Sequence, residues 1–258
     1  MRARSCAHFE RIVSVNLILL ENENTRQLVP ATSLACKHLL EIVHLGEGDT
    51  FWCGVKNRSR GLATIEKIVP AGLEISIKWE SENATFGVPA TILVIGLSRP
   101  QTMKKVLANA AELGVQKICV FVSENTDPSY AQSSLWREGN NEIEAIFTKT
   151  AEQTCTTNIP ELQFFNSLAD ALKCVPAGVV FDVYEKGVPA NEVQFGVPAT
   201  FAIGSERGWT ARERELFRGN AWQFAHLGAR VLRVETAATF AHALALASLK
   251  NWQAHKTL

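Results

Sequence analysis

Residues 227–237 read Leu-Gly-Ala-Arg-Val-Leu-Arg-Val-Glu-Thr-Ala, and residues 204–209 read Gly-Ser-Glu-Arg-Gly-Trp. Each stretch lies between an apolar run typical of a strand and a pattern typical of a helix. Turns that follow neighbouring parallel strands meet at the carboxyl edge of an open α/β sheet, where such sheets bind ligands. The two stretches therefore predict a small-molecule pocket in an α/β domain.

The second part of the chain alternates strand-like and helix-like patterns. Residues 91–97 form a continuous apolar run, as in a strand buried on both faces, and helical spacing follows over residues 101–113. Further strands are expected at 117–122, 179–183, 200–203 and 222–227, and further helices at 142–155, 211–217 and 234–252. This alternation predicts a largely parallel sheet.

The first third of the chain contains short strand-like runs separated by turns. Strands are expected at residues 15–20, 50–55, 62–69 and 73–79, with helical spacing over 36–43. Several strands at short spacing predict a small β-barrel. Residues 81–84 are the expected linker. Residues 1–14 are either a disordered leader or the product of an upstream start codon, so that Met1 need not be the true start.

The bulk composition limits the classes of function. The 258 residues include 26 basic and 26 acidic side chains, giving a formal net charge of zero. A general nucleic-acid binder is usually basic overall, so any RNA contact requires a local basic patch. The six cysteines include no C-x-x-C pair, so no metal site is expected, and the cytoplasm is the expected compartment. No segment is long and apolar enough to predict a membrane span.

The side chains in the two turns suit ligand binding, but structural alternatives exist. Glycine at position 204 lets backbone N–H groups approach a ligand, and Glu206 could accept hydrogen bonds from a ribose or an amine. The planar fork of arginine suits phosphate or carboxylate groups. Alternatively, the first turn is only a strand-to-helix connection, and Glu235 only complements a helix dipole. His226 is either a structural residue or a pocket residue.

Together, the order and spacing of the turns resemble the SPOUT methyltransferases. Within them they resemble the family that methylates N3 of a uridine in small-subunit ribosomal RNA, which usually carries Gly-Pro-Glu-Gly-Gly followed by Leu-Gly-x-Arg-x-Leu-Arg-x-Glu-Thr-Ala. Residues 111–115, residues 152–160 and residues 38–49 also match family patterns in the right order. The resemblance covers most of residues 91–250.

The resemblance implies an architecture and an activity. It implies an N-terminal PUA-like β-barrel over residues 15–84 and a C-terminal SPOUT α/β domain with a deep trefoil knot over residues 85–258. The expected reaction is transfer of the methyl group of S-adenosyl-L-methionine to N3 of a uridine in 16S ribosomal RNA, on the small ribosomal subunit, by a homodimer. The helical stripe of Phe240, Leu244 and Ala247 is core or dimer interface. Alternatives are methylation of another RNA nucleotide and a non-catalytic RNA-binding assembly factor.

The resemblance also implies roles for individual residues. Glu235 is the expected base or base-orienting group, and Arg233 is expected to stabilise the developing uracil anion. The residues expected to bind the cofactor are Ile203, Gly204, Glu206, Leu227, Gly228, Val231, Leu232 and Thr236. The residues expected to contact RNA are Arg99, Arg207, Trp209, Arg214 and Arg230, with Trp209 stacking on a base.

Several positions depart from the family pattern. Ser205 replaces the usual proline of the first turn, and Arg207 replaces a glycine. Residues 156–158 are Thr-Thr-Asn where family members often carry arginine, and His44 stands where the N-terminal pattern has arginine. These changes leave the map of RNA contacts more open than the cofactor pocket.

Overall fold

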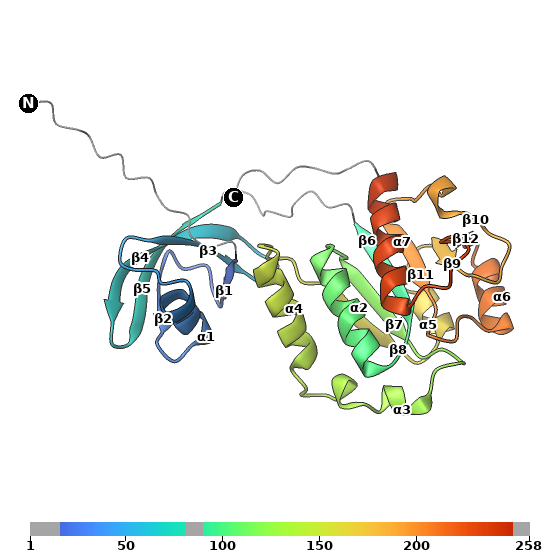
Figure 1. Cartoon of the computed structure of the whole chain (residues 1–258), viewed down its shortest axis with the longest axis horizontal. Helices are drawn as coiled ribbons and strands as arrows, with labels where there is room; N and C mark the ends of the chain where they lie inside the picture. The colour runs from blue at the N-terminus through green and yellow to red at the C-terminus, as the bar shows by residue number, and fades with distance from the viewer. Residues whose placement is uncertain (1–15, 81–89, 250–258) are drawn as a thin grey trace, which may run out of the picture. The chain divides into compact units, whose positions relative to one another are not determined.

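The computed structural model describes residues 16–80 and 90–249, which form two compact units (Figure 1). The first unit comprises residues 16–80 together with residues 151–157, and the second comprises residues 90–150 and 158–249. The expected leader and the expected linker lie outside the described residues. The expected domains placed residues 151–157 in the second domain, whereas in the structure they pack with the first unit.

The first unit is built on a five-stranded sheet in the order β1-β3-β4-β5-β2. Its strands are β1 (Ile18–Leu20), β2 (Arg26–Pro30), β3 (Thr50–Val55), β4 (Arg60–Val69) and β5 (Gly72–Trp79). β1 pairs with β3 in parallel, and the other pairs are antiparallel. A short helix α1 (Leu34–Lys37) continues into the π-helical turn η1 (His38–Ile42). This short-stranded sheet fits the half-barrel of the expected PUA-like domain.

Residues 151–157 complete the core of the first unit. Cys155 packs in one buried cluster with Leu17 and Trp52. The backbone N–H of Leu17 donates to the carbonyl of Glu152 at 2.9 Å, and the N–H of Leu19 donates to its carboxylate at 3.3 Å. Burial raises the pKa of the Glu152 carboxyl. These contacts satisfy backbone donors at the start of β1, which is an edge strand of the sheet.

The second unit is a seven-stranded parallel sheet in the order β10-β12-β9-β11-β6-β7-β8. The strands are β6 (Thr91–Gly96), β7 (Lys117–Phe121), β8 (Glu161–Phe165), β9 (Val179–Phe181), β10 (Val188–Pro189), β11 (Ala199–Ile203) and β12 (Gln223–His226). The helices are α2 (Pro100–Glu112), α3 (Pro128–Ala131), α4 (Glu142–Gln153), α5 (Leu168–Leu172), α6 (Ala211–Gly219) and α7 (Val234–Ser248), with short 3₁₀ turns η2 (Ser134–Trp136) and η3 (Ala190–Glu192).

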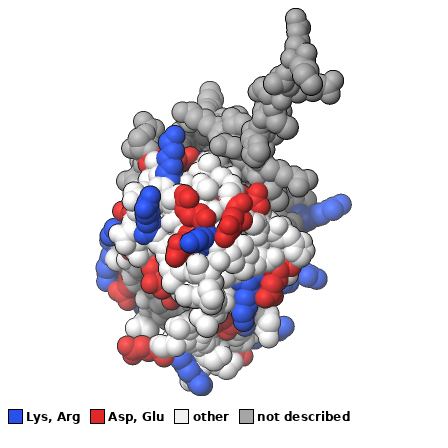
Figure 2. Space-filling view, turned by 90° about the vertical axis from the view of Figure 1, so that its left-hand side faces the viewer, with Lys and Arg blue, Asp and Glu red and all other residues white. Residues whose placement is uncertain are grey.

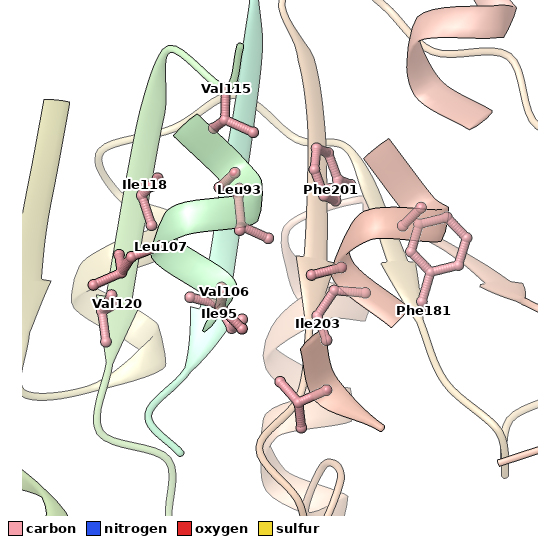
Figure 3. Packing of buried hydrophobic residues seen from close by; sticks show 14 of the residues in the cluster. Leu93, Ile95, Val106, Leu107, Val115, Ile118, Val120, Phe181, Phe201 and Ile203 are labelled. Atoms are coloured by element: carbon pink, nitrogen blue, oxygen red, sulfur yellow. The ribbon is translucent and has the colours of Figure 1, made fainter. Parts of the chain in front are cut away.

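Successive residues of the central strands face opposite sides of the sheet, and both sides are covered. Leu93 and Ile95 of β6 pack in one cluster with α2 and α7, part of which is drawn in Figure 3. Val94 of β6 belongs to a second cluster with residues of α5 and α6, including Phe217. A strand buried on both faces reads as a continuous apolar run, which is why residues 91–97 predicted it correctly.

Several element bounds differ from those expected. β9 ends at Phe181, two residues before the expected strand end, and the carboxylate of Asp182, the next residue, binds an arginine side chain. α7 is described to Ser248, and the rest of the expected helix lies mostly outside the described residues. β2, β8, β10, α3 and α5 were not expected. β8 is a half-exposed edge strand, so it lacks the long apolar run of the central strands.

Candidate functional site

Three segments leave the carboxyl edge of the sheet side by side. β9 lies between β11 and β12, and Phe181 is level with Ile203 on one side and Ala225 on the other. Gly204, Asp182 and Leu227 therefore begin three neighbouring loops. The two stretches that predicted the pocket, residues 204–209 and 227–233, lie on either side of the loop that follows β9. The carboxyl edge of a parallel sheet is where such folds bind ligands.

The turn at residues 204–209 packs closely against the end of β6. A Cβ atom on Gly96 would lie 2.6 Å from the backbone nitrogen of Ser205, so only glycine allows this approach. The N–H of Gly208 donates to the carbonyl of Ser205 at 2.9 Å and closes the turn. The carboxylate of Glu206 accepts from the backbone N–H of Arg99 at 2.9 Å, at the start of α2. Glu206 and Arg99, expected in two different roles, are thus neighbours.

Trp209 lies in the core of the second unit, and its expected stacking on an RNA base does not fit this position. The residue is 4% exposed, and its ring stacks on Phe121 at 5.9 Å between centroids. Its indole N–H donates to the carbonyl of Phe181 at 2.9 Å. Burial and a satisfied indole N–H make Trp209 a structural residue that fixes the first turn against β9.

The loop at residues 227–233 is open to solvent and offers backbone donors. Gly228 has a φ of 97°, a left-handed conformation, and a Cβ there would meet no atom within 4 Å. Its N–H donates to Nδ1 of His226 at 3.2 Å. In the described part of the chain, no backbone N–H from Ala229 to Arg233 donates to another protein group. Val231 is 78% exposed, so this loop has room and free donors for a ligand.

The beginning of α7 brings the two expected catalytic residues to the same edge. Arg233 is the N-cap residue of α7 and is exposed to solvent. The side chain of Glu235 is only 16% exposed, and its carboxylate lies 3.5 Å from Nζ of Lys105 on α2. Thr236 in the same helical turn is exposed. Ile203 is buried at the end of β11, and Leu227 and Leu232 are half-buried in the open loop.

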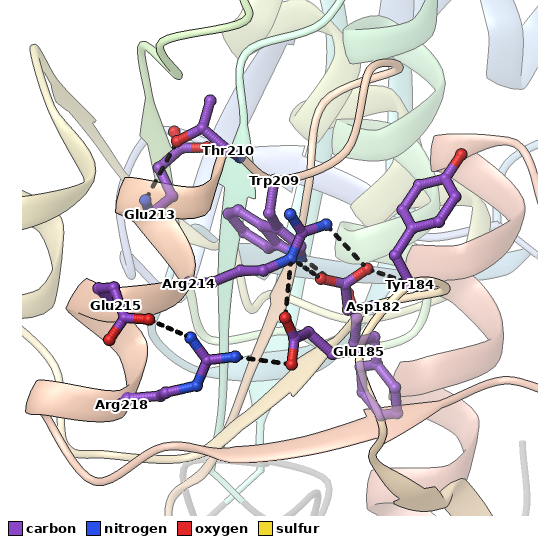
Figure 4. A network of polar contacts seen from close by, with 10 residues as sticks. Asp182, Tyr184, Glu185, Trp209, Thr210, Glu213, Arg214, Glu215 and Arg218 are labelled. Atoms are coloured by element: carbon purple, nitrogen blue, oxygen red, sulfur yellow. Dashed lines mark hydrogen bonds and ion pairs between the residues drawn. The ribbon is translucent and has the colours of Figure 1, made fainter.

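Arg214 belongs to a network of ion pairs, so its expected role as an RNA contact does not fit. Its Nε donates to the carboxylate of Asp182 at 2.6 Å and lies 3.6 Å from Glu185 (Figure 4). Arg218 pairs with Glu185 at 2.6 Å and with Glu215 at 2.5 Å. The hydrogen bond to Asp182 raises the pKa of the Arg214 guanidinium. These arginines are neutralised by acids of the same unit and are not a basic patch.

Three exposed arginines lie in the edge loops. Among the described residues, no carboxylate lies within ion-pair distance of Arg207, Arg230 or Arg233. Arg99 donates from Nε to the hydroxyl of Tyr130 at 3.1 Å. On the face shown in Figure 2, the described lysines and arginines are instead interspersed with aspartates and glutamates. The arginines of the edge loops are therefore the cations best placed to contact a polyanion.

A cavity of about 230 Å³ lies at the opposite edge of the sheet and is separate from these turns. It is lined by residues at the beginnings of β9, β11 and β12, including Gly178, Thr200 and Gln223. Within residues 16–80 and 90–249, no group of three or more histidine, cysteine, aspartate or glutamate side chains is arranged to hold a metal ion. No described helix is long and apolar enough to cross a membrane. The cytoplasmic location stays a prediction.

Comparison with known proteins identifies the family. A family model described as the RNA methyltransferase domain matches residues 88–246, which include the whole carboxyl edge. The chain belongs to this RNA methyltransferase family. The resemblance seen in the two turns is thus confirmed at the level of the family.

Relatives of similar length carry names from the same class. The chain is 28% identical over 256 residues to the ribosomal RNA small subunit methyltransferase E of Treponema pallidum, covering 93% of each chain. It is 24% identical over 250 residues to the ribosomal RNA small subunit methyltransferase E 1 of Borreliella burgdorferi, covering 92% of this chain and 100% of the relative.

Solved structures of methyltransferases share the fold. The ribosomal RNA small subunit methyltransferase E of Neisseria gonorrhoeae, bound to S-adenosyl methionine, matches with a TM-score of 0.73 at 20% identity, covering 88% of this chain and 95% of that one. A putative methyltransferase of Legionella pneumophila, in complex with the same cofactor, matches with a TM-score of 0.74 at 21% identity, covering 92% and 98%. At these identities the likeness establishes the α/β fold with its parallel sheet.

The loop in the middle of this carboxyl edge was not expected from the sequence. The loop after β9 carries Asp182, Tyr184 and Glu185, none of which was expected in the site. The expected strand ran through Val183, so these residues were assigned to the strand or left unassigned. An acidic residue directly after three buried strand residues was the available signal, because a charge seldom continues a strand buried on both faces.

Proposed function

We propose that this chain transfers the methyl group of S-adenosyl-L-methionine to N3 of a uridine in the 16S ribosomal RNA of the small ribosomal subunit. The observation that supports this most strongly is the pair of family-like turns on either side of β9. They place free backbone donors and the exposed Arg207, Arg230 and Arg233 at one edge. The names of the relatives and the cofactor in the related structures point the same way.

The residues present fit the cofactor. Adenosine presents hydrogen-bond acceptors, and the loop from Ala229 to Arg233 has unused N–H donors. The open space at Gly228 and the close packing of Gly96 against Ser205 leave the two turns free of side-chain obstruction. Ile203, Gly204, Glu206, Leu227, Gly228, Val231, Leu232 and Thr236 would hold the cofactor. When bound, it supplies a methyl group on a sulfonium that is already reactive.

The protein's own contribution is positioning and control of charge. Glu235 at the start of α7 would orient the uracil or accept its N3 proton, and Arg233 would stabilise the resulting anion. Arg99, Arg207 and Arg230 would contact RNA phosphates through exposed guanidinium groups. The edge loops exclude water only if the RNA itself covers them, because they are open in the protein alone.

We also propose that the second unit carries the trefoil knot of its family and that the chain works as a homodimer in the cytoplasm. Phe240 on α7 is 46% exposed and belongs to the helical stripe expected to be core or dimer interface, so a second copy of the chain could cover it. Sedimentation equilibrium should give a mass near twice 28.4 kDa, and Phe240→Asp should shift it toward the monomer. A wild-type monomer at micromolar concentration would contradict the dimer.

The cofactor site can be tested at Gly228. Gly228→Val forces a branched side chain into a left-handed conformation and points it at the proposed ligand, so affinity for S-adenosyl-L-methionine should fall more than about tenfold. The backbone strain should also lower the free energy of unfolding, by about 1–3 kcal/mol. Isothermal titration calorimetry measures the first effect and denaturant unfolding the second.

Gly139 provides a matched control outside the edge loops. It also has a left-handed φ, of 79°, and a Cβ there would meet no atom within 4 Å. Gly139→Val should therefore cost similar stability but leave cofactor affinity unchanged. Equal affinities of all three proteins would remove the site from this loop. A wild type that binds the cofactor but methylates no RNA on isolated small subunits would point to the non-catalytic alternative.

A further inference from the structure

The loop after β9 occupies the centre of the carboxyl edge. Phe181 is level with Ile203 and with Ala225, the strand residues that precede the two family-like turns. The loop at residues 182–187 therefore begins between the two turns. The role proposed above assigns nothing to these residues.

Asp182 fixes the shape of this loop. Its backbone N–H donates to the carbonyl of Ala225 at 3.0 Å, and its carboxylate accepts from the backbone N–H of Tyr184 at 2.9 Å. The same carboxylate binds Arg214 of α6, and the Asp182 side chain is only 2% exposed. A buried carboxylate with several donors holds its position firmly, so the backbone at Tyr184 is set by the fold.

Tyr184 presents an exposed aromatic ring from this fixed backbone. The residue is 76% exposed, in contrast to the buried Trp209. The guanidinium carbon of Arg214 lies 5.9 Å from the centroid of the ring, at the outer limit of a cation–π contact. In Figure 4 the ring stands beside the ion pairs and its hydroxyl points away from them. A ring held at its base and left in water keeps its apolar face available to a partner.

The charges around Tyr184 favour stacking over phosphate binding. The acids Asp182 and Glu185 are paired with Arg214 and Arg218, so among the described residues the exposed Lys186 is the one cation of this loop without a carboxylate within ion-pair distance. Bases of single-stranded RNA stack on aromatic side chains, and a target base must leave its own stack to be modified. An exposed ring beside mostly paired charges suits a base, while the arginines of the neighbouring loops suit the backbone.

We propose that Tyr184 stacks on a nucleobase of the substrate RNA beside the methyl-transfer site, the role that Trp209 cannot fill. This inference rests on the proposed function. Asp182 acts as a positioning residue, because it orients the backbone of Tyr184 and has no exposed carboxylate surface of its own.

The test is binding of a fluorescein-labelled single-stranded oligouridine to the full chain, measured by anisotropy over a range of salt concentrations. Tyr184→Ala should weaken binding about 5- to 150-fold, the range found for loss of one base–aromatic stack. Tyr184→Phe should bind like the wild type, since the ring is kept. The dependence of affinity on salt should stay the same in both variants, because stacking releases no counterions.

Two controls distinguish a failure of the stacking role from a failure of the proposed methyl-transfer function. Phe164→Ala removes another exposed ring, on the outer strand β8, and should leave oligouridine binding unchanged. Calorimetry with S-adenosyl-L-methionine should give equal affinities for the wild type and Tyr184→Ala. If the wild type binds cofactor and RNA but Tyr184→Ala binds RNA equally well, the stacking role is wrong and the proposed function stands. If the wild type binds neither, both proposals are overturned.

Discussion

Glu235 shows how a single side chain can serve both a helix and a reaction. It lies in the first turn of α7, where a negative charge complements the helix dipole, and its carboxylate is close to Lys105 of α2. A purely structural role would be satisfied by these two interactions. A catalytic role requires in addition that the carboxylate act on the uracil N3 proton, and that role alone predicts an effect on the rate of methyl transfer.

Glu235→Gln keeps the shape of the side chain and removes its charge. If Glu235 accepts the proton, the variant should bind S-adenosyl-L-methionine normally, and single-turnover methylation should fall by a factor on the order of 10²–10⁴. Lys105→Met is the matched control, because it removes the same ion pair and leaves the carboxylate in place. A Glu235→Gln rate within a few-fold of the wild type would mean that the proton leaves to solvent.

At the scale of elements, α7 is attached to the sheet through a buried histidine. His242 is 1% exposed, its Nε2 lies 3.0 Å from Oγ1 of Thr91 on β6, and its ring stacks on Phe201 of β11 at 5.6 Å. Burial lowers the pKa of His242 to about 4. The helix that begins with the proposed catalytic residues is therefore packed on a side chain that must stay neutral.

The stability of the protein should consequently fall in mild acid. An unfolded histidine titrates near pH 6.5, so between about pH 6.5 and 4 the unfolded chain binds a proton that the folded chain does not. The contribution of neutral His242 is complete above that window and is lost as the pH falls through it, by about 3 kcal/mol at most. Denaturant unfolding of the wild type and His242→Gln over this range measures the difference. A His242→Gln slope equal to that of the wild type would contradict the assignment.

At the scale of the whole molecule, the net charge is zero, but the arginines differ in whether an acidic side chain forms an ion pair with them. The arginines of α6 are bound by acids, whereas Arg207 and Arg230 stand exposed in the edge loops. A neutral protein can bind RNA if its unpaired cations are gathered where the RNA lies. Arg207 and Arg230 flank the proposed cofactor site, so we expect the RNA to bind at that edge.

The salt dependence of RNA binding should show which arginines are free to contact RNA phosphates and which are held in ion pairs. Arg207→Gln and Arg230→Gln should each reduce the slope of log affinity against log salt by about 0.7, the value for one phosphate contact on single-stranded RNA. Arg214→Gln should leave the slope unchanged but lower the free energy of unfolding by about 3 kcal/mol, because it strands the buried Asp182 carboxylate. A slope altered only by Arg214→Gln would place the RNA on α6 instead.

The sequence pattern predicted the features that depend on residues close together in the chain. The run at residues 91–97 and the turn at residues 204–209 gave the central strands and the carboxyl edge, because alternation and glycine placement are local signals. The pairing of Arg214 with Asp182 and the burial of Trp209 are set by packing between segments distant in sequence. A basic stretch on a helix looks the same whether or not acids from another loop neutralise it, so the expected RNA contacts were less reliable than the expected fold.

Residues 151–157 have a consequence for dissecting the protein by truncation. Thr157 donates from its hydroxyl to the carbonyl of Arg58 at 2.7 Å, and its carbonyl accepts from the N–H of Asn57 at 2.7 Å. A fragment that stops after the N-terminal sheet would lack these bonds and would leave Leu17 and Trp52 without Cys155. The N-terminal unit is therefore not a transplantable module. A fusion or an isolated fragment meant to carry it must also carry a segment encoded in the middle of the methyltransferase sequence.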